Sequence, residues 1–307
     1  MKPVKRYVVP SGTGRVVRDV LAHASADPRA VIEGRVFVGR KRVVRDDEPV
    51  REGDIVEIAA VLSVEQRAPI TVLARTDDLV AVDKPAGIPT IPDHAGAAHA
   101  LVTLAARALG LDASSLHATS RLDREVSGVV VFALTRDAAS RLSGARTRGE
   151  YQRNYVAISA RAPEPASGVW SESIGRAADP RLRKVGGRDP APALTRYSDC
   201  GRAPRGEAML SVTPVTGRTH QIRVHAAHAG APLLGDRAYG AKARIVLESG
   251  QVLEPRRIAL HALHIVVPAE RAGSVLTVVA PVPQELRDLW SALGGDASSW
   301  DVSTTCA

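Results

Sequence analysis

One acid, Asp123, lies between two arginines in the segment RLDREVSG, residues 121–128. The charged run ends at Ser127-Gly128 and the apolar stretch VVVFAL follows directly, so Asp123 is expected at the start of a buried strand. Two interpretations of such a carboxylate are open. It is a member of a surface ion pair or a turn cap, or it is a nucleophile that a neighbouring cation keeps ionised.

A second group of reactive side chains lies in the segment PVTGRTHQIRVHAAHAGAPLLGDRAYG, residues 214–240. Its members are Arg218, His220, Gln221, Arg223, His225 and His228. Alternation along RTHQIRV, as in a strand, would send some of these side chains to one face and some to the other. One interpretation is a pocket wall, in which an arginine pairs with a catalytic acid while its neighbours hold phosphate and sugar.

The histidine spacing offers a metal site as the alternative interpretation. His225 and His228 are three positions apart, and His261 and His264 repeat that spacing. A zinc site would also need further ligands, yet the sequence contains no HExxH motif, no CxxC motif and no obvious acidic third ligand. The sequence therefore favours the pocket wall over the metal site.

The composition favours a polyanionic partner. The 307 residues carry a formal net charge of +8, and surface cations neutralise phosphates well. The alternative is that the charge reflects a biased composition or serves solubility. No stretch approaches the roughly 18 unbroken apolar residues of a membrane span, and the first residues lack the apolar segment of a secretion signal. We therefore expect a cytoplasmic protein without membrane association.

Residues 1–64 are predicted to form a small α+β domain. A helix is expected over residues 11–25, where Ser11 and Thr13 are cap-type residues, and a second short helix between Pro28 and Gly34. Strands are expected at VFVG, RKRVV and IVEIAAV. Residues 63–69 are expected to be a linker.

From residue 70 onward, strand-like runs alternate with a few helices and Pro/Gly turns. Two strands are expected around the turn at residues 76–78, another at VVVFALT, and helices over residues 95–110 and at RDAASRLSGART. Hairpins and surface loops are expected over residues 160–207. This mixture predicts an α+β fold with a largely antiparallel sheet, in a domain of residues 70–295 that is followed by a tail, residues 296–307.

Segment 214–240 is similar to the third signature of the RluA-type pseudouridine synthases, TGRTHQIRVH followed by GxPLLGDxxYG. Further segments resemble other signatures of this family in chain order: VAVDKPAGIPTIP, SRLDREVSG, RNYVAI, APALT, IALHA and APVPQEL. Residues 1–64 resemble the S4 RNA-binding domain in EGRVFVGRKRVV and PVREGDIVEI. Several ordered motifs over about 220 residues make an accidental match improbable, although each motif alone is weak.

The resemblance implies an enzyme that isomerises uridines of rRNA or tRNA to pseudouridine, without a cofactor or metal and as a monomer. It implies that Asp123 is the nucleophile, paired with Arg223, and that Tyr155 stacks on the uracil and takes its C5 proton. It also implies that Arg121 enters the space left by the extruded base. The remaining RNA contacts that it implies are Arg218, His220 and Gln221. Asp123 and Arg223 are 100 positions apart, so this interpretation requires the fold to bring them together with Tyr155 in one cleft.

Two positions depart from the family pattern, because Ser120 replaces a histidine and Val126 replaces a threonine. They bear on the positioning of RNA or of the nucleophile turn, and we expect activity to survive. The alternative function is a non-catalytic RNA-binding or ribosome-assembly protein on the same fold. Hydrolysis of a nucleoside bond would call for a second carboxylate near Asp123, which is not evident in the sequence.

Overall fold

A computed structural model gives the structure of the chain. It describes residues 4–12, 16–27, 29–32, 36–39, 41–43, 45–59, 70–92, 97–270 and 273–301. The chain divides into two compact units, one of residues 1–69 with 91–113 and one of residues 70–90 with 114–307. Residues 91–113 thus group with the first unit, whereas the sequence placed them in the domain of residues 70–295.

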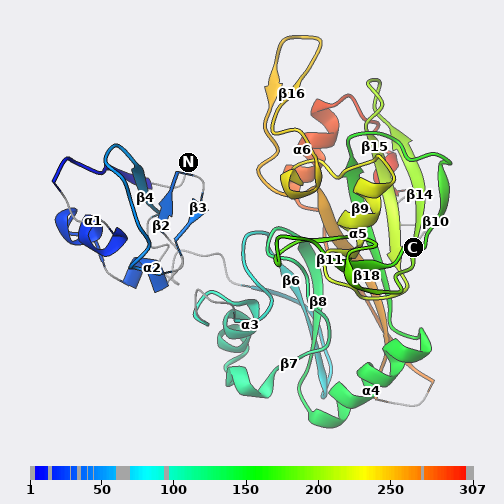
Figure 1. The fold of residues 1–307 in the computed structure, drawn as a ribbon. Helices are drawn as coiled ribbons and strands as arrows, with labels where there is room; N and C mark the ends of the chain where they lie inside the picture. The colour runs from blue at the N-terminus through cyan, green and yellow to red at the C-terminus, as the bar shows by residue number, and fades with distance from the viewer. Residues whose placement is uncertain are drawn as a thin grey trace. The chain divides into compact units, whose positions relative to one another are not determined.

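The first unit contains a four-stranded antiparallel sheet of order β1-β4-β2-β3 (Figure 1). Its elements are β1 (Val4–Val8), α1 (Val17–His23), α2 (Arg29–Ile32), β2 (Val36–Val38), β3 (Lys41–Arg42), β4 (Ile55–Ala59) and α3 (Leu101–Leu109). Its aliphatic core includes Val17 and Leu21 of α1 and Val56 and Ile58 of β4. The expected strands are confirmed, and β1 is an additional strand that the sequence analysis did not assign.

The start of α1 differs from the sequence-based expectation. The N-cap residue is Val16, which makes no side-chain cap hydrogen bond, and the Ser11 hydroxyl instead donates to Glu52 at 3.2 Å. Thr13, Pro28, Gly34 and the linker of residues 63–69 lie outside the described residues. The predicted helix at residues 95–110 is confirmed in its second half, because α3 spans Leu101–Leu109 and Gly110 is its C-cap residue.

The second unit is built on a ten-stranded sheet whose main path is β10-β14-β15-β9-β18-β8-β6-β5. The strands are β5 (Thr71–Arg75), β6 (Leu79–Lys84), β7 (His117–Ala118), β8 (Ser127–Ala133), β9 (Gln152–Ser159), β10 (Ser167–Trp170), β14 (Thr195–Arg202), β15 (Ala208–Pro214), β18 (Leu260–Pro268) and β19 (Val275–Val279). Strand β7 pairs with β8 and β19 with β18. All these pairings are antiparallel except β8–β18, which confirms an α+β fold with a largely antiparallel sheet.

Helices and small sheets complete this unit (Figure 1). They are η2 (Ala113–Ser115, at the boundary of the two units), α4 (Arg136–Arg148), β11 (Ile174–Arg176), β12 (Arg183–Val185), β13 (Arg188–Ala191), α5 (Gln221–His228), η3 (Arg237–Tyr239), β16 (Ile245–Val246), β17 (Val252–Leu253) and α6 (Gln284–Ala292). Helix α4 begins where the Thr135 hydroxyl accepts the Ala138 N–H, and its Leu142 joins an aliphatic core with β6, β8 and β18. Trp300, in the segment expected to be a tail, is buried in a second core with Trp290 of α6.

The parallel pair β8–β18 approaches closely at Gly128, directly after the acid-bearing turn. Gly128 has φ +116°, and a Cβ atom at this position would lie 2.1 Å from the carbonyl oxygen of Ala262. Only glycine fits such a backbone conformation and such an approach. The Ser127-Gly128 pair of the sequence therefore fixes where the turn ends and where β8 enters the sheet. Over the part of the chain that the structure describes, no helix is long and apolar enough to cross a membrane.

Candidate active site

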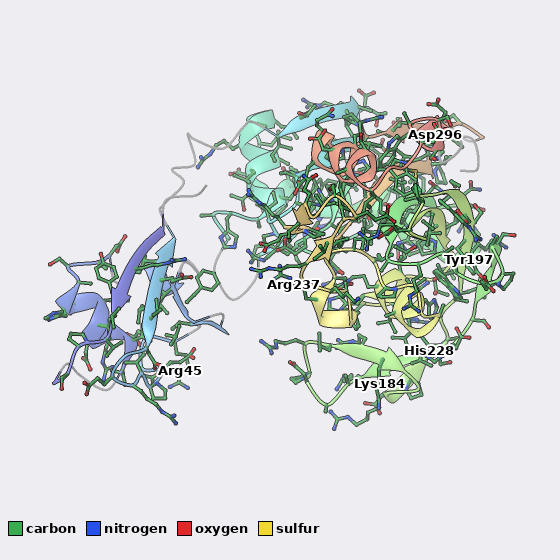
Figure 2. The ribbon with its side chains drawn as sticks, turned by 90° about the horizontal axis from the view of Figure 1, so that it is seen from above. Arg45, Lys184, Tyr197, His228, Arg237 and Asp296 are labelled. Carbon is green, nitrogen blue, oxygen red and sulfur yellow. The ribbon has the colours of Figure 1, made fainter. Side chains whose placement is uncertain are left out.

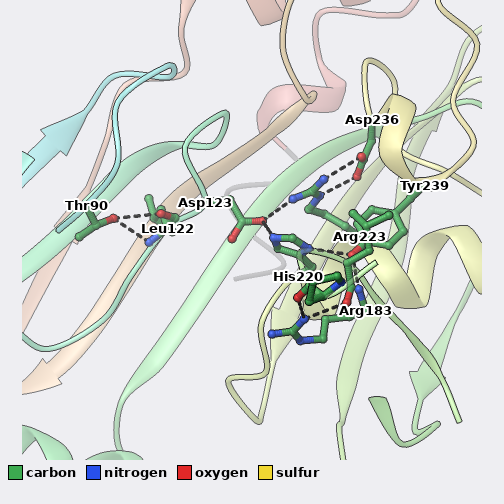
Figure 3. Close-up of polar contacts among 10 residues, drawn as sticks. Thr90, Leu122, Asp123, Arg183, His220, Arg223, Asp236 and Tyr239 are labelled. Carbon is green, nitrogen blue, oxygen red and sulfur yellow. Dashed lines mark hydrogen bonds and ion pairs between the residues drawn. The ribbon is translucent and has the colours of Figure 1, made fainter. Parts of the chain in front are cut away.

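The turn that carries Asp123 is held by backbone hydrogen bonds before and after this residue, and Figure 3 shows the first of them, between Leu122 and Thr90. Before Asp123, the Leu122 N–H donates to the Thr90 hydroxyl at 3.0 Å, and this hydroxyl donates to the Leu122 carbonyl at 3.0 Å. After Asp123, the Val126 N–H donates to the Asp123 carbonyl at 3.1 Å and closes the turn. The backbone of Asp123 is thus held in place while 28% of its side chain stays exposed.

Lys84, at the end of β6, binds backbone carbonyls of the same turn. Its Nζ donates to the carbonyl oxygens of Pro85 at 3.1 Å, Arg124 at 3.1 Å and Val126 at 2.6 Å. The side chain is fully buried, and burial lowers its pKa to about 7. Three carbonyl acceptors match the three hydrogens of an ammonium group, so this lysine stiffens the turn instead of facing the substrate.

The fold brings Asp123 and Arg223 together, as the sequence analysis expected. Arg223 Nη1 donates to Asp123 Oδ2 at 2.8 Å, across 100 positions of the chain. The other side of the guanidinium binds Asp236 with two hydrogen bonds, from Nε at 2.7 Å and from Nη2 at 2.9 Å. Burial alone would lower the pKa of Arg223, but the contacts with Asp236 and Asp123 raise it above its usual range. Arg223 is therefore a fixed cation beside the Asp123 carboxylate.

Arg223 lies on a helix, so the strand-like alternation along RTHQIRV is wrong. Helix α5 begins at Gln221, after His220 as its N-cap residue with φ +58°. The Gln221 Oε1 accepts the Thr216 hydroxyl at 2.7 Å and the Arg218 N–H at 2.9 Å, which folds the preceding residues into a tight loop. Arg223 then follows one half-turn into α5 and points at Asp123 and Asp236 (Figure 3).

His220 lies at the turn that carries Asp123. Its Nε2 is 3.8 Å from Asp123 Oδ2, and its Nδ1 is 2.7 Å from the Tyr239 hydroxyl. Tyr239 also accepts the Arg183 N–H at 3.0 Å, and its ring lies against the Arg223 guanidinium at 4.8 Å. Burial lowers the pKa of His220, although the nearby Asp123 raises it. The histidine that the resemblance assigned to RNA is therefore a neighbour of Asp123.

Tyr155 reaches the site from the centre of the sheet. It lies on β9 opposite Ala262 of β18, and Ala262 is opposite Gly128 of β8, so Tyr155 is in register with the strand that follows the Asp123 turn. Burial raises the pKa of Tyr155, and the Asp123 carboxylate is among the charges that raise it further. The phenol therefore stays protonated at neutral pH.

The remaining expected RNA contacts differ in their exposure. Arg121 and Arg218 are exposed, and Arg218 Nε donates to the Pro192 carbonyl at 2.9 Å. Gln221 is only 4% exposed, and its Nε2 donates to the Leu194 carbonyl and the Thr195 hydroxyl in addition to the contacts of its Oε1. The expectation that Gln221 contacts RNA is thus not supported, because its amide is used inside the protein.

Both departures from the family pattern are buried in the second unit. Ser120 is 7% exposed and accepts the Tyr151 hydroxyl at 3.2 Å, so it belongs to a small internal hydrogen-bond group. Val126 is 2% exposed, and it contributes to the turn through its backbone, whose N–H binds the Asp123 carbonyl and whose carbonyl binds Lys84. Neither substitution touches the Asp123–Arg223 pair.

Two of the four histidines of the metal interpretation, His225 and His261, contact other groups of the protein. His225 contacts the Thr195 hydroxyl through Nδ1 and the Glu172 carbonyl through Nε2, each at 2.9 Å. His261 Nδ1 is 2.7 Å from the Ser127 hydroxyl. Among the residues that the structure describes, no group of three His, Cys, Asp or Glu side chains is placed to hold a metal ion.

Three residues of the site were not singled out from the sequence: Thr90, Asp236 and Tyr239. Asp236 and Tyr239 are the acid and the tyrosine of the quoted segment GDxxYG, so the motif carried the signal although their partners were not evident. Asp236 is 1% exposed, which a sequence pattern alone does not reveal. Thr90 acts through its hydroxyl on the backbone of a residue 32 positions away, and no local spacing indicates such a contact.

Comparisons with known proteins identify the family of the chain. A family model described as RNA pseudouridylate synthase matches residues 78–228. Ribosomal large subunit pseudouridine synthase D of Vibrio cholerae is 30% identical over 288 residues, covering 87% of this chain and 86% of that protein. The protein of that name from Xanthomonas campestris is 32% identical over 272 residues, covering 83% and 80%. The structure of human RNA pseudouridylate synthase domain containing 4 matches with a TM-score of 0.59 at 25% identity, over 73% of this chain and 93% of that one. The chain therefore belongs to the RNA pseudouridylate synthase family and is an enzyme that isomerises uridine to pseudouridine in RNA.

Proposed function

We propose that Asp123 is the nucleophile of this isomerisation. The observation that carries the proposal is the contact of Asp123 Oδ2 with Arg223, a cation that Asp236 orients from its other side. Both donors near the carboxylate, Arg223 and His220, face Oδ2. The other oxygen, Oδ1, is then the one that attacks. A carboxylate held ionised in this way is suited to covalent catalysis.

The reaction balances without an external reagent. Asp123 Oδ1 attacks C1′ of the target uridine, the C1′–N1 bond breaks, and the uracil leaves with the electron pair. The base turns, its C5 attacks C1′, and the bond between Asp123 and C1′ breaks, which restores the carboxylate. C5 then loses its proton and N1 gains one, so that the product is an isomer of the substrate.

Tyr155 serves as a stacking surface in this proposal. Because burial keeps its phenol protonated at neutral pH, it is a poor acceptor for the C5 proton. Its place beside the turn suits contact with the uracil face, since aromatic rings stack on extruded bases. Arg121, exposed and two positions before Asp123, is placed to enter the space that the base leaves.

The RNA surface is proposed to include exposed cations next to the site. Arg218 precedes His220 by two positions, Arg237 directly follows Asp236, and Lys184 is adjacent to Arg183, whose N–H binds Tyr239. Figure 2 shows Lys184 and Arg237 on this unit. Lysine and arginine contacts to phosphate supply much of the affinity of proteins for RNA.

The substrate is proposed to be ribosomal RNA of the large subunit, because the relatives covering most of the chain carry that RNA in their names. The first unit is proposed to be an S4-like domain that adds RNA affinity. We propose that the enzyme works as a monomer in the cytoplasm. Neither the family assignment nor the geometry favours a non-catalytic RNA-binding role, because the ionic pair of the site is intact.

Mapping of product positions tests the substrate proposal. The purified protein is incubated separately with large-subunit rRNA fragments and with tRNA transcripts, and pseudouridines are located by carbodiimide treatment and primer extension. The expected result is stoichiometric modification of a uridine in the rRNA. Modification of tRNA alone would contradict the proposal for the substrate while leaving the isomerase activity established.

A further inference from the structure

His220 is held in an unusual backbone conformation that directs its ring toward Asp123. Its φ of +58° belongs to the left-handed region, which side chains other than glycine rarely adopt. It is the N-cap residue of α5 but makes no side-chain cap hydrogen bond to this helix. Its ring instead lies edge-on to Tyr239, with centroids 5.7 Å apart and planes at 78°. The strained backbone thus serves contacts of the ring with Tyr239 and Asp123 (Figure 3).

The carboxylate of Asp123 favours one tautomer of the neutral His220 ring. With the hydrogen on Nδ1, the Nε2 lone pair would face Asp123 Oδ2 at 3.8 Å, which is repulsive. With the hydrogen on Nε2, the ring presents a donor to Asp123, and its Nδ1 accepts the Tyr239 hydroxyl at 2.7 Å. The Tyr239 oxygen accepts the Arg183 N–H at the same time. The neutral ring is therefore assigned an Nε2–H on the side of Asp123.

The surroundings keep this ring neutral near neutral pH. Burial lowers the pKa of His220, the charges of Arg223 on α5 and Arg183 on β12 lower it further, and Asp123 and Asp236 act in the opposite direction. The groups that face the ring thus come from the nucleophile turn, α5, β12 and the segment before η3. A neutral donor supports the carboxylate without adding a second cation to the pair with Arg223.

We propose that His220 is a positioning residue for the nucleophile, holding Asp123 Oδ2 jointly with Arg223 so that Oδ1 is aimed at the ribose. The proposal rests on Asp123 being the nucleophile. The Nε2–Oδ2 distance of 3.8 Å is longer than a hydrogen bond, and such contacts commonly shorten when substrate binds. The same donor stabilises the carboxylate when it leaves C1′ in the second half of the reaction. This role replaces the RNA contact that the sequence resemblance implied for His220.

Two substitutions at this position separate positioning from structure. Asn tolerates the left-handed conformation and retains an amide near Tyr239, but it does not reach Asp123. Gln is longer and places an N–H near the former Nε2. Single-turnover rates on rRNA fragments are expected to fall about 10- to 100-fold in His220→Asn, the size of one hydrogen bond to a charged group, and to recover in part in His220→Gln. KM and RNA affinity are expected to stay within about threefold of wild type.

The pH profile supplies an independent readout. The wild-type rate is expected to fall as the pH decreases through the lowered pKa of His220, because the protonated ring puts a second cation on Oδ2 and weakens the nucleophile. This acid limb is expected to disappear in His220→Asn and His220→Gln. An unchanged limb in both variants would overturn the proposal, as would equal rates for the two variants or a change in KM alone.

Tyr239→Phe keeps the test decisive if a His220 variant fails to fold. Without the hydroxyl, His220 Nδ1 loses the donor that it accepts from, and the rate is expected to fall about threefold to tenfold. In the His220→Asn background the same change is expected to add nothing, since coupled residues are not additive. Additive losses would contradict the coupling of Tyr239 to His220. Activity of Asp123→Asn refutes the nucleophile itself, whereas an inactive Asp123→Asn with a normal His220→Asn refutes only the role of His220.

Discussion

At the scale of residues, the site is a row of three alternating charges, an acid on a turn, an arginine on a helix and an acid on a loop. Asp123, Arg223 and Asp236 stand in that order, and Arg223 contacts both acids. In the proposed mechanism the partly exposed acid, Asp123, is the nucleophile, while the buried acid, Asp236, fixes the arginine between them. Because Asp236 is buried and Asp123 is partly open, the two carboxylates have different tasks although they share one partner.

Asp236→Asn is expected to weaken both the fold and the catalysis. Asn keeps the shape but removes the buried anion, so the free energy of unfolding should fall by about 3 kcal/mol or more, the usual cost of breaking a buried ion pair. The turnover number should fall about 10- to 100-fold because Arg223 is no longer oriented. Urea unfolding and the release of tritium from C5 of labelled uridine measure the two effects.

Asp179→Asn is the matched control, because Asp179 pairs with Arg181 on the surface at 2.6 Å. This variant should show no measurable change in unfolding or turnover, since exposed pairs contribute little. Equal behaviour of the two variants would contradict the account of Asp236.

At the scale of elements, sequence patterns predicted the helix α4 and the strands β5, β6 and β8, because each has a regular period or an unbroken apolar run. They did not predict α5. Its residues from Gln221 to Ala226 are all buried, so the helix has no polar face whose period could be recognised. The pairing of β8 with β18 joins segments more than 100 positions apart, and local spacing carries no information on such a contact.

Gly128→Ala tests the close approach of β8 and β18. A Cβ atom would lie 2.1 Å from the Ala262 carbonyl oxygen, so the strands must separate and the Asp123 turn must shift. The free energy of unfolding is expected to fall by several kcal/mol, because the cost of overpacking adds to the cost of the positive φ for alanine. Most of the activity is expected to be lost with it. Gly149→Ala is the control: this glycine has φ +77° with no atom within 4 Å of a Cβ, so only the backbone cost of roughly 1–2 kcal/mol is expected. Thermal unfolding measures the loss of stability in both variants. Equal losses would show that the close approach of β8 and β18 is unimportant.

At the scale of the whole molecule, the chain combines an excess of basic residues with two compact units, each with its own core. The catalytic fold was predictable because ordered motifs extend over most of its length. The grouping of residues 91–113 was not, because it depends on contacts between segments that are distant in sequence. The burial of Trp300 could not be predicted either, since a single aromatic residue forms no periodic pattern in the sequence.

A chain beginning at residue 70 is expected to bind rRNA fragments more weakly than the full chain. Each lost phosphate contact should reduce the slope of log affinity against log salt by roughly 0.7 to 0.9 units. Filter binding or fluorescence anisotropy between 50 and 300 mM salt measures the slope, with circular dichroism to show that the shorter chain is folded. An identical slope for the two chains would contradict an RNA-binding role of residues 1–64.

The most direct test of the account is the turnover of Asp123→Asn. Tritium release from C5 of uridine in the rRNA substrate is measured for wild type and variant, together with RNA affinity and urea unfolding. Loss of a covalent nucleophile predicts a decrease of at least about 10³-fold in turnover, with RNA affinity within about threefold and a cooperative unfolding transition retained. Turnover within tenfold of wild type would contradict the central claim that Asp123 attacks the ribose.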